Sequence, residues 1–349
     1  MVTTDQQQAL LSVRDLKTYF NTEEGVVRAV DGVSFDIHPG KTLGIVGESG
    51  CGKSTVGRAI LQILDRGGVI ESGSILWKKD DADGTSRVVD IAHESPDGKL
   101  MRSIRGEDIA LVFQEPMTSF SPVHTIGNQL VEAIRLHRDV SKKEALNRSE
   151  ELLELVGIPN PRQRLSEYSF QLSGGLRQRA MIAMALSCDP GLLIADEPTT
   201  ALDVTTQAQI LDLLRHLQET NGMSVMLITH NLGVIAEMAD DVVVMYLGKA
   251  VESGPIDEVF HSPQHPYTQG LLRSIPSIYA KGVGKLPSIP GSIPHPFNRP
   301  SGCEFRPRCP SFMEGVCDLN VPRFLPIEGT EQSVTCFLHH SPQEEANVG

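Results

Sequence analysis

The chain is short of the features that mark nucleic-acid-binding and membrane-spanning proteins. It has 31 Lys and Arg against 44 Asp and Glu, a formal net charge of −13 and no long basic block, so the electrostatic footprint of a nucleic-acid binder is missing. No stretch approaches the roughly 18 uninterrupted apolar residues of a transmembrane helix. Residues 1–8 are polar and lack the apolar core of a signal peptide. We therefore expect a cytosolic protein that reaches a membrane only through partner chains.

Cysteine is scarce and unevenly distributed. Of six cysteines, Cys51 lies in a glycine-rich segment and Cys188 follows an apolar helical run. The other four crowd the last fifth of the chain: Cys303, Cys309, Cys317 and Cys336. In a reducing cytosol such a cluster favours metal binding over disulfides. The spacing C-x5-C-x7-C-x18-C contains no C-x2-C pair, whereas zinc ribbons usually do.

The length of 349 residues exceeds one compact domain, so we expect one large domain and an appendage. Apolar runs predict strands at 11–13, 26–30, 33–37, 41–46, 109–113, 192–195, 224–228 and 242–246. Helical patterns lie at 55–64, across most of 126–187, and at 205–219 and 232–238. This alternation is typical of an α/β protein with a parallel sheet. Residues 78–99 are polar and predict a surface loop or hairpin. Prolines are dense from Pro263 to Pro326, which predicts a loop-rich appendage.

The most specific motif is G-x-x-x-x-G-K-S, which follows an apolar strand and precedes a helix. Its residues are Gly47, Glu48, Ser49, Gly50, Cys51, Gly52, Lys53 and Ser54, and Thr55 comes next. This is the P-loop, whose backbone N–H groups and helix N-terminus cradle nucleotide phosphates. We expect Lys53 to reach the β- and γ-phosphates and the Ser54 hydroxyl to hold Mg²⁺.

A second apolar strand ends in two acidic residues, Asp196 and Glu197. A strand that delivers a carboxylate beside a P-loop is the second element of an ATP-hydrolysing site. Asp196 is predicted to hold Mg²⁺ through water. Glu197 is predicted to polarise the attacking water as a general base.

The run Leu172-Ser173-Gly174-Gly175-Leu176-Arg177-Gln178-Arg179 stands before a helix. With the two motifs above, it resembles the signature of the ATP-binding cassette (ABC) family. The resemblance implies that Ser173, Gly174 and Gly175 bind the γ-phosphate held by the opposite subunit, so that ATP is sandwiched between two cassettes. The family has Gln where this chain has Leu176, a departure that concerns a ribose contact and leaves the phosphate contact intact.

Other elements of the ABC pattern follow in order. Gln114 ends a strand and matches the glutamine that senses Mg²⁺ and the attacking water. Asp203 matches the loop that crosses the dimer interface, in the run 201–203. His230 follows an apolar strand and matches the histidine that contacts the γ-phosphate. Phe20, with Tyr19 as the alternative, matches the aromatic residue that stacks on adenine.

The run from 110 to 122 (ALVFQEPMTSFSP), the P-loop and the proline-rich tail resemble the ATPases of oligopeptide, dipeptide and nickel importers. The resemblance implies a P-loop ABC-type nucleotide-binding domain at 1–262, with a RecA-like core and a helical subdomain at about 115–187. It also implies a C-terminal extension at 263–349. In such importers a second, related ATPase, two transmembrane permeases and an extracytoplasmic peptide-binding protein complete the assembly, and the ATPase lies at the cytoplasmic face of the membrane.

The resemblance implies ATP and Mg²⁺ as ligands and peptide import as the work done. Four thiolates suit a [4Fe–4S] cluster, which some peptide-importer ATPases carry in this extension; Zn²⁺ and free thiols stay open. Nickel or another small solute is an alternative cargo. The alternatives to transport are an ABC ATPase that acts on nucleic acid, against which the acidic composition argues, and a redox sensor that uses ATP as a switch.

Overall fold

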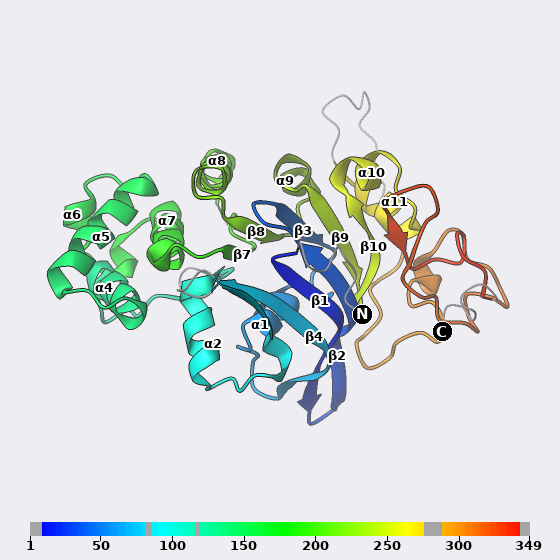
Figure 1. Ribbon diagram of the computed structural model, residues 1–349. Coiled ribbons are helices and arrows are strands. Elements are labelled where there is room, and N and C mark those ends of the chain that lie inside the picture. Colours follow the sequence, from blue (N-terminus) through cyan, green and yellow to red (C-terminus); the bar gives the residue numbers. More distant parts are fainter. Residues whose placement is uncertain (1–8, 81–84, 116–118, 201, 276–287, 343–349) are drawn as a thin grey trace.

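The computed structural model describes residues 9–80, 85–115, 119–200, 202–275 and 288–342. Two sheets lie at the centre, a layer of helices stands at one end, and the C-terminal segment covers the other end (Figure 1). The arrangement confirms the predicted α/β class. The polar segment 1–8, residues 116–118 of the 110–122 run and residue 201 lie outside the described residues.

The strands of the described residues are β1 (Leu11–Thr22), β2 (Gly25–Ile37), β3 (Thr42–Val46), β4 (Gly68–Asp80), β5 (Ser86–Asp90), β6 (Ile109–Val112), β7 (Leu192–Asp196), β8 (Ser224–Ile228), β9 (Asp241–Tyr246), β10 (Lys249–Pro255), β11 (Leu325–Pro326) and β12 (Ser333–Val334). The α-helices are α1 (Lys53–Ile60), α2 (Lys99–Ser103), α4 (Ile126–His137), α5 (Lys142–Leu155), α6 (Pro161–Arg164), α7 (Gly174–Ala185), α8 (Val204–Asn221), α9 (Leu232–Met238), α10 (Ile256–His261) and α11 (Pro266–Arg273).

The larger sheet positions the site. Within the described residues its strand order is β11-β12-β10-β9-β3-β8-β7-β6. Strand β3 runs parallel to both β8 and β9, and β7 runs parallel to β6 and β8. Parallel strands bring their carboxyl ends to one edge, where ligands bind in open α/β sheets. The residues that follow β3, β6, β7 and β8 therefore meet at one place.

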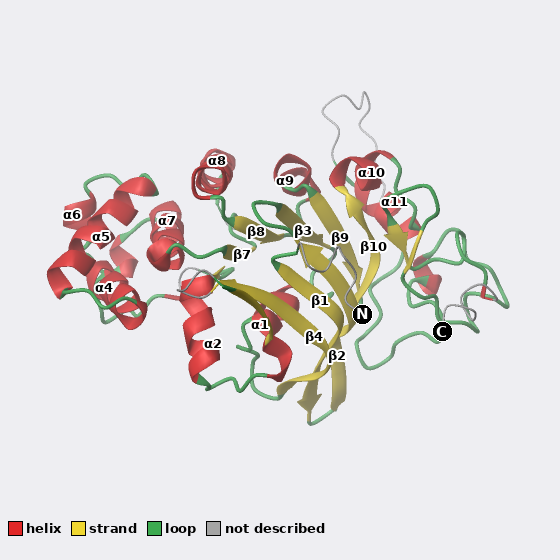
Figure 2. Ribbon diagram, viewed as in Figure 1, coloured by secondary structure: helices red, strands yellow, loops and turns green. Residues whose placement is uncertain are grey.

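Alternate residues of the parallel strands face opposite sides of the sheet, as the strand period of two requires. In β9, Val243 and Met245 pack into the core shared with α1 and the antiparallel sheet β2-β1-β4-β5, whereas Val242 and Val244 pack on the side of α8 and α9. Both faces are covered (Figure 2), so these strands read as continuous apolar runs.

The helical layer α4–α7 stands apart from the sheets at the end of β6 (Figure 1). Helices α4, α5 and α7 begin at side-chain caps. At the start of α4, Thr125 accepts a hydrogen bond from the Asn128 N–H at 3.2 Å. Ser141 and Glu144 form a reciprocal capping box at the start of α5. The predicted helical region at 126–187 is confirmed.

Several boundaries differ from the prediction. The runs at 26–30 and 33–37 form one strand, β2, and β1 extends from Leu11 to Thr22, because the two strands pair along their length from Leu11↔Ile37 to Thr22↔Gly25. Helix α1 covers Lys53–Ile60 rather than 55–64. Of residues 78–99, the described part includes the end of β4 and the paired strand β5, so the hairpin alternative is confirmed.

The C-terminal segment is joined to the larger sheet. Strand β12 pairs antiparallel with β10 and so lengthens the main sheet. Phe305 and Tyr267 are buried against Tyr246 of β9, with ring centroids 5.3 and 4.8 Å from the Tyr246 ring. The segment therefore shares the hydrophobic core beside the larger sheet.

Helix α11 depends on a neutral histidine. His265 is 2% exposed, and its Nδ1 accepts the Tyr267 N–H at 3.0 Å as the helix cap. The backbone N–H of His265 donates to the buried Glu252 carboxylate at 3.0 Å, and His339 lies nearby. Burial, reinforced by the charge of His339, lowers the pKa of His265 to about 3. Between about pH 3 and pH 6.5, the folded protein therefore keeps the His265 ring neutral, whereas the unfolded chain protonates it.

We expect the unfolding free energy of the variant His265→Asn to decrease less in acid than that of the wild type. A depressed folded-state pKa contributes stability that is full above the unfolded pKa, about 6.5, and is lost as the pH falls toward about 3. The loss from this group approaches about 1.4 kcal/mol per pH unit. Asn retains an acceptor for the helix cap. Urea unfolding at pH 7 and pH 5.5 measures how the unfolding free energy of each protein changes with pH. An equal change in the two proteins would contradict the assignment.

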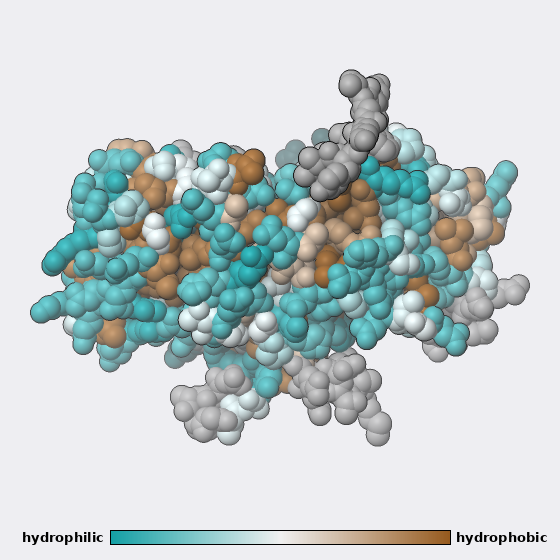
Figure 3. Space-filling model, turned by 90° about the horizontal axis from the view of Figure 1, so that it is seen from above, coloured by the Kyte–Doolittle hydropathy of each residue, from teal (hydrophilic) through white to brown (hydrophobic). Residues whose placement is uncertain are grey.

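The face of the molecule seen from above is largely hydrophilic (Figure 3). Seen from above, hydrophobic residues gather mainly between the helical layer and the sheet (Figure 3). In the described part of the chain, none of the helices combines the length and the apolar character needed to cross a lipid bilayer.

Candidate active site

The P-loop turns tightly between β3 and α1. Gly52 has φ +102° and stands directly before α1, and a Cβ at this position would lie 2.0 Å from the Ala29 carbonyl oxygen. A Cβ on Gly47 would lie 2.2 Å from the Met245 carbonyl oxygen. Only glycine fits these two places. The glycines of the motif thus let the loop lie against β2 and β9 while its other side faces the cavity.

Lys53 is buried at the base of this loop, 5% exposed. Its Nζ donates to the Gly47 carbonyl at 2.8 Å and to the Glu48 carbonyl at 3.1 Å. The ammonium group is thus held over the loop, where phosphate oxygens can replace these carbonyls as acceptors.

Ser54 and Asp196 form the predicted metal pair. The Ser54 hydroxyl donates to Asp196 Oδ1 at 2.9 Å, and Asp196 at the end of β7 is 4% exposed. Burial raises the pKa of Asp196, and the bond from Ser54 partly opposes this. A buried carboxylate beside a hydroxyl offers the hard oxygen ligands that Mg²⁺ prefers. The donor set therefore fits the cation.

Glu197 is held by three side chains. Its Oε2 accepts from Thr200 Oγ1 at 2.8 Å and from Gln114 Nε2 at 3.1 Å, and its Oε1 lies 3.1 Å from His230 Nδ1. Burial alone would raise the pKa of Glu197, but hydrogen bonds from His230 and Thr200 bring it below the ordinary value. The group is therefore an ionised carboxylate at neutral pH.

The backbone of Glu197 is strained. Its φ is +46°, in the left-handed region that a non-glycine residue rarely adopts. The Glu197 N–H donates to the Ile228 carbonyl of the neighbouring strand at 2.8 Å, which holds the conformation. Strain of this kind concentrates at functional sites, and here it turns the carboxylate from the end of β7 toward the cavity.

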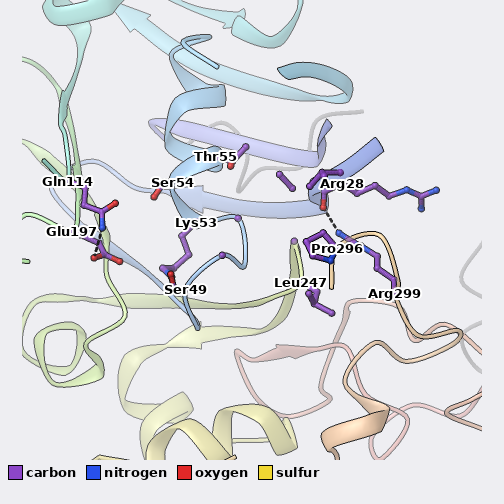
Figure 4. Close-up of a pocket in the computed structure, with 15 residues that line it drawn as sticks. Arg28, Ser49, Lys53, Ser54, Thr55, Gln114, Glu197, Leu247, Pro296 and Arg299 are labelled. Carbon is purple, nitrogen blue, oxygen red and sulfur yellow. Dashed lines mark hydrogen bonds between the residues drawn. The ribbon is translucent and has the colours of Figure 1, made fainter. Parts of the chain in front are cut away.

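Eight of the predicted site residues line one pocket (Figure 4). The sequence-predicted members of its lining are Ser49, Gly50, Gly52, Lys53, Ser54, Thr55, Gln114 and Glu197. Gly47, Glu48 and Cys51 belong to the loop but not to the lining, because Cys51 is buried and the Glu48 side chain turns toward the C-terminal segment. His230 and Asp196 touch the site through Glu197 and Ser54.

Sequence reasoning missed the other wall of the pocket. It consists of Val27, Arg28, Ala29, Leu247, Gly248, Pro296 and Arg299. Arg299 comes from the C-terminal segment, donates to the Arg28 carbonyl and pairs with Glu304 at 3.0 Å (Figure 4). No sequence motif marks these residues. Thr200 was missed as well, although its position three residues after Glu197 could have signalled it.

Neither aromatic candidate lines the pocket. Phe20 pairs with Val27, a lining residue, and so shares its face of the sheet; it packs against Gly68. The Tyr19 hydroxyl donates to Asp31 at 2.9 Å, and burial together with this bond raises the pKa of Tyr19 to about 12. Tyr19 likewise pairs with a lining residue, Arg28, so the register does not separate the two candidates. The contact of Phe20 with adenine, with Tyr19 as the alternative, stays a prediction.

The signature loop lies outside the pocket. Ser173 caps α7 by accepting the Leu176 N–H at 3.4 Å. Gly175 packs against Thr206, at the start of α8, where Asp203 is the cap and accepts the Thr206 N–H at 3.0 Å. The signature loop and Asp203 therefore stand together, away from the P-loop of the same chain.

The four tail cysteines do not form a metal site in this structure. All are free thiols, and among the described residues no three His, Cys, Asp or Glu side chains gather as metal ligands. Burial, with smaller contributions from the neighbouring thiols, raises the pKa of Cys303 to about 11 and of Cys336 to about 12. The structure therefore does not support the expected [4Fe–4S] cluster.

Comparison with known proteins places this site in a family. Residues 30–200 match the family described as ABC transporter, and residues 251–317 match the oligopeptide/dipeptide transporter C-terminal region. A putative peptide import ATP-binding protein of Brucella melitensis is 51% identical over 90% of this chain and 93% of its own. The dipeptide transport ATP-binding protein DppD of Bacillus subtilis is 47% identical over 97% of each chain. A solved dimeric structure of a bacterial ABC transporter cassette, 26% identical, covers 70% of this chain and 98% of its own, with a TM-score of 0.59.

Proposed function

The chain belongs to the ATP-binding proteins of ABC transporters, and from this premise we propose that it is the ATP-hydrolysing subunit of a dipeptide and oligopeptide importer. The main observation that supports this proposal is the pocket in which Lys53, the Ser54–Asp196 pair and Glu197 meet. The C-terminal match at residues 251–317 supports the peptide cargo, as do the names of the two relatives.

The pocket performs hydrolysis by positioning and charge. Lys53 and the loop N–H groups bind the phosphates of ATP. Ser54, Asp196 and Gln114 would hold Mg²⁺, which when bound neutralises charge on the phosphate oxygens. Glu197 accepts a proton from water as the water oxygen bonds to the γ-phosphorus. The bond from that phosphorus to the ADP oxygen breaks, and ADP and phosphate leave.

A second ATPase subunit would complete the site. The signature loop stands beside Asp203 and α8 and does not line the phosphate pocket of its own chain. A partner cassette in the reverse orientation would supply the missing anion-binding wall, and the solved cassette named above is described as a dimer. Closure of the pair would move the helical layer, and two permeases bound to it would carry the movement across the membrane. The subunit would then lie peripherally at the cytoplasmic face.

The test is transport by the whole complex. The chain is reconstituted in vesicles with a second ATPase, two permeases and an extracytoplasmic binding protein of the peptide-import class. We expect ATP-dependent uptake of a labelled tripeptide and ATPase activity that rises with peptide-loaded binding protein. Uptake of nickel without uptake of peptide would show that nickel, the alternative solute, is the cargo. ATPase activity near zero in the complete complex would favour the redox sensor.

We propose, separately, that the four tail thiols bind [4Fe–4S] once the cluster is supplied during assembly. The support is their number and closeness. The Cys303 N–H donates to the Cys317 carbonyl at 2.7 Å, and the other three thiols contribute to the raised pKa of Cys336. Protein purified without oxygen is examined by visible absorption with iron, sulfide and zinc analysis. Broad absorption with about four iron and four sulfide per chain supports the cluster. One zinc, or no metal, overturns it.

A further inference from the structure

The phosphate-binding loop contains an acidic residue. Glu48 is the second residue of the P-loop, and its backbone carbonyl accepts Lys53 Nζ at 3.1 Å. A carboxylate in an anion-binding loop repels a polyphosphate, and the repulsion is strong where water is partly excluded. The chain therefore needs a device that holds this charge away from the nucleotide or cancels it.

The C-terminal segment supplies that device. Arg308 Nη1 donates to Glu48 Oε2 at 2.7 Å and Nη2 donates to Oε1 at 3.0 Å. This is the two-bond geometry in which guanidinium and carboxylate pair most strongly. Arg308 is 5% exposed and the Glu48 side chain is 26% exposed, so solvent reaches the pair only from the Glu48 side.

Arg308 is itself fixed from three sides. Its Nε donates to the Pro290 carbonyl at 3.0 Å, and its guanidinium carbon lies 5.8 Å from the centroid of the Tyr246 ring. It ends a short 3-10 turn, Arg306–Arg308, that follows the buried Phe305. The guanidinium is thus presented to the loop by a rigid part of the fold.

The same segment holds the backbone of Glu48. The Glu48 N–H donates to the Tyr267 hydroxyl at 2.9 Å, and Tyr267 is fully buried on α11. This N–H is therefore turned away from the phosphates. The carboxylate, N–H and carbonyl of Glu48 are bonded to Arg308, Tyr267 and Lys53 in turn, so one P-loop residue links the C-terminal segment to the phosphate-binding lysine.

We propose that Arg308 is a positioning residue of the nucleotide site, through which the C-terminal segment sets the affinity of the P-loop for MgATP. It cancels the Glu48 charge and fixes the loop without touching the nucleotide. The inference deepens the proposed ATPase function and rests on it. It predicts effects of opposite sign for the two partners of the ion pair, which a merely structural role does not.

The test compares Arg308→Gln, Glu48→Gln and the double variant in the full-length chain, with equilibrium binding of MgATP as the readout. Removing one partner of a buried charge pair exposes the other, so Arg308→Gln should raise the Kd about tenfold. Glu48→Gln leaves a positive charge beside the loop and should lower the Kd about threefold. The double variant should return to within about threefold of the wild type. Arg138→Gln, which loses a pair with Asp189 in a remote part of the chain, is the control and should match the wild type.

Two further readouts separate positioning from folding. In ATPase assays Arg308→Gln should raise KM and leave kcat nearly unchanged, the sign of lost uniform binding. Limited proteolysis of the C-terminal segment reports its docking.

If Arg308→Gln does not fold, Glu48→Gln still tests the proposal, because weaker MgATP binding by that variant overturns it. Equal binding by Arg308→Gln and the wild type overturns it too, as does a double variant as weak as Arg308→Gln. A wild type that does not bind MgATP refutes the proposed function instead.

Discussion

Glu197→Gln should abolish most ATP hydrolysis while MgATP binding persists. The position and charge of this carboxylate suit proton acceptance from water, and Gln keeps its size and one oxygen acceptor. General base catalysis typically contributes about 10²- to 10⁴-fold to a rate, so we expect kcat to fall at least about 100-fold. Steady-state ATPase assays and MgATP binding on the same preparation measure the two quantities.

The hydrogen bonds around Glu197 make this test specific. Thr200, Gln114 and His230 donate to or pair with its two oxygens, and the amide of Gln can satisfy only part of this arrangement. The matched control is Glu219→Gln, the same chemical change on the exposed face of α8, which should retain the wild-type rate. Hydrolysis by Glu197→Gln at the wild-type rate would show that another group takes the proton. If two cassettes close on ATP, the variant should also accumulate as an ATP-bound dimer in gel filtration.

Short sequence patterns were enough to predict the site residues at the carboxyl ends of the parallel strands. The P-loop needs glycine at Gly52 for close contact with β2, and the apolar runs before Asp196 and His230 are buried on both faces of a parallel sheet. Such features are written in a few neighbouring residues. For this reason β8 and α9 match the predicted ranges 224–228 and 232–238 to the residue.

The antiparallel elements were harder to predict because their formation depends on partners distant in sequence. Strand β10 contains Gly254, Pro255 and the charged Glu252, a composition that argues against a strand. It forms because β9 pairs on one side and β12 on the other, and Glu252 is buried because the N–H groups of Gln264 and His265 donate to it.

The wall of the pocket formed by Pro296 and Arg299 could not be predicted for a related reason. The two residues come from a proline-rich segment without periodicity, about 240 residues after the P-loop. What brings them there is the docking of Tyr267, Phe305 and β12 on the main sheet. The sequence placed a loop-rich appendage in this region but contained no signal that it would reach the nucleotide site.

Lys53→Ala should lose MgATP binding itself, in contrast to Glu197→Gln. The Lys53 ammonium is 5% exposed and donates to two carbonyls of the loop, so it is already oriented toward the space where phosphates bind. Hydrogen bonds to charged groups contribute about 1.5–3 kcal/mol each, and we expect the Kd for MgATP to rise about 100-fold, with ATPase activity lost in proportion.

Two comparisons make the result decisive. Lys41→Ala removes a lysine that pairs with Asp240 at 2.7 Å on the surface at the other end of β3; exposed pairs contribute about 0–1 kcal/mol, so this variant should bind MgATP normally. Lys53→Arg keeps the charge but brings a larger planar group into a buried position between two carbonyls, and it should bind nearly as weakly as Lys53→Ala. Normal binding by Lys53→Arg would mean that charge alone matters. Normal binding by Lys53→Ala would mean that the backbone N–H groups of the loop hold the phosphates without the lysine, and the role assigned to Lys53 would then be wrong.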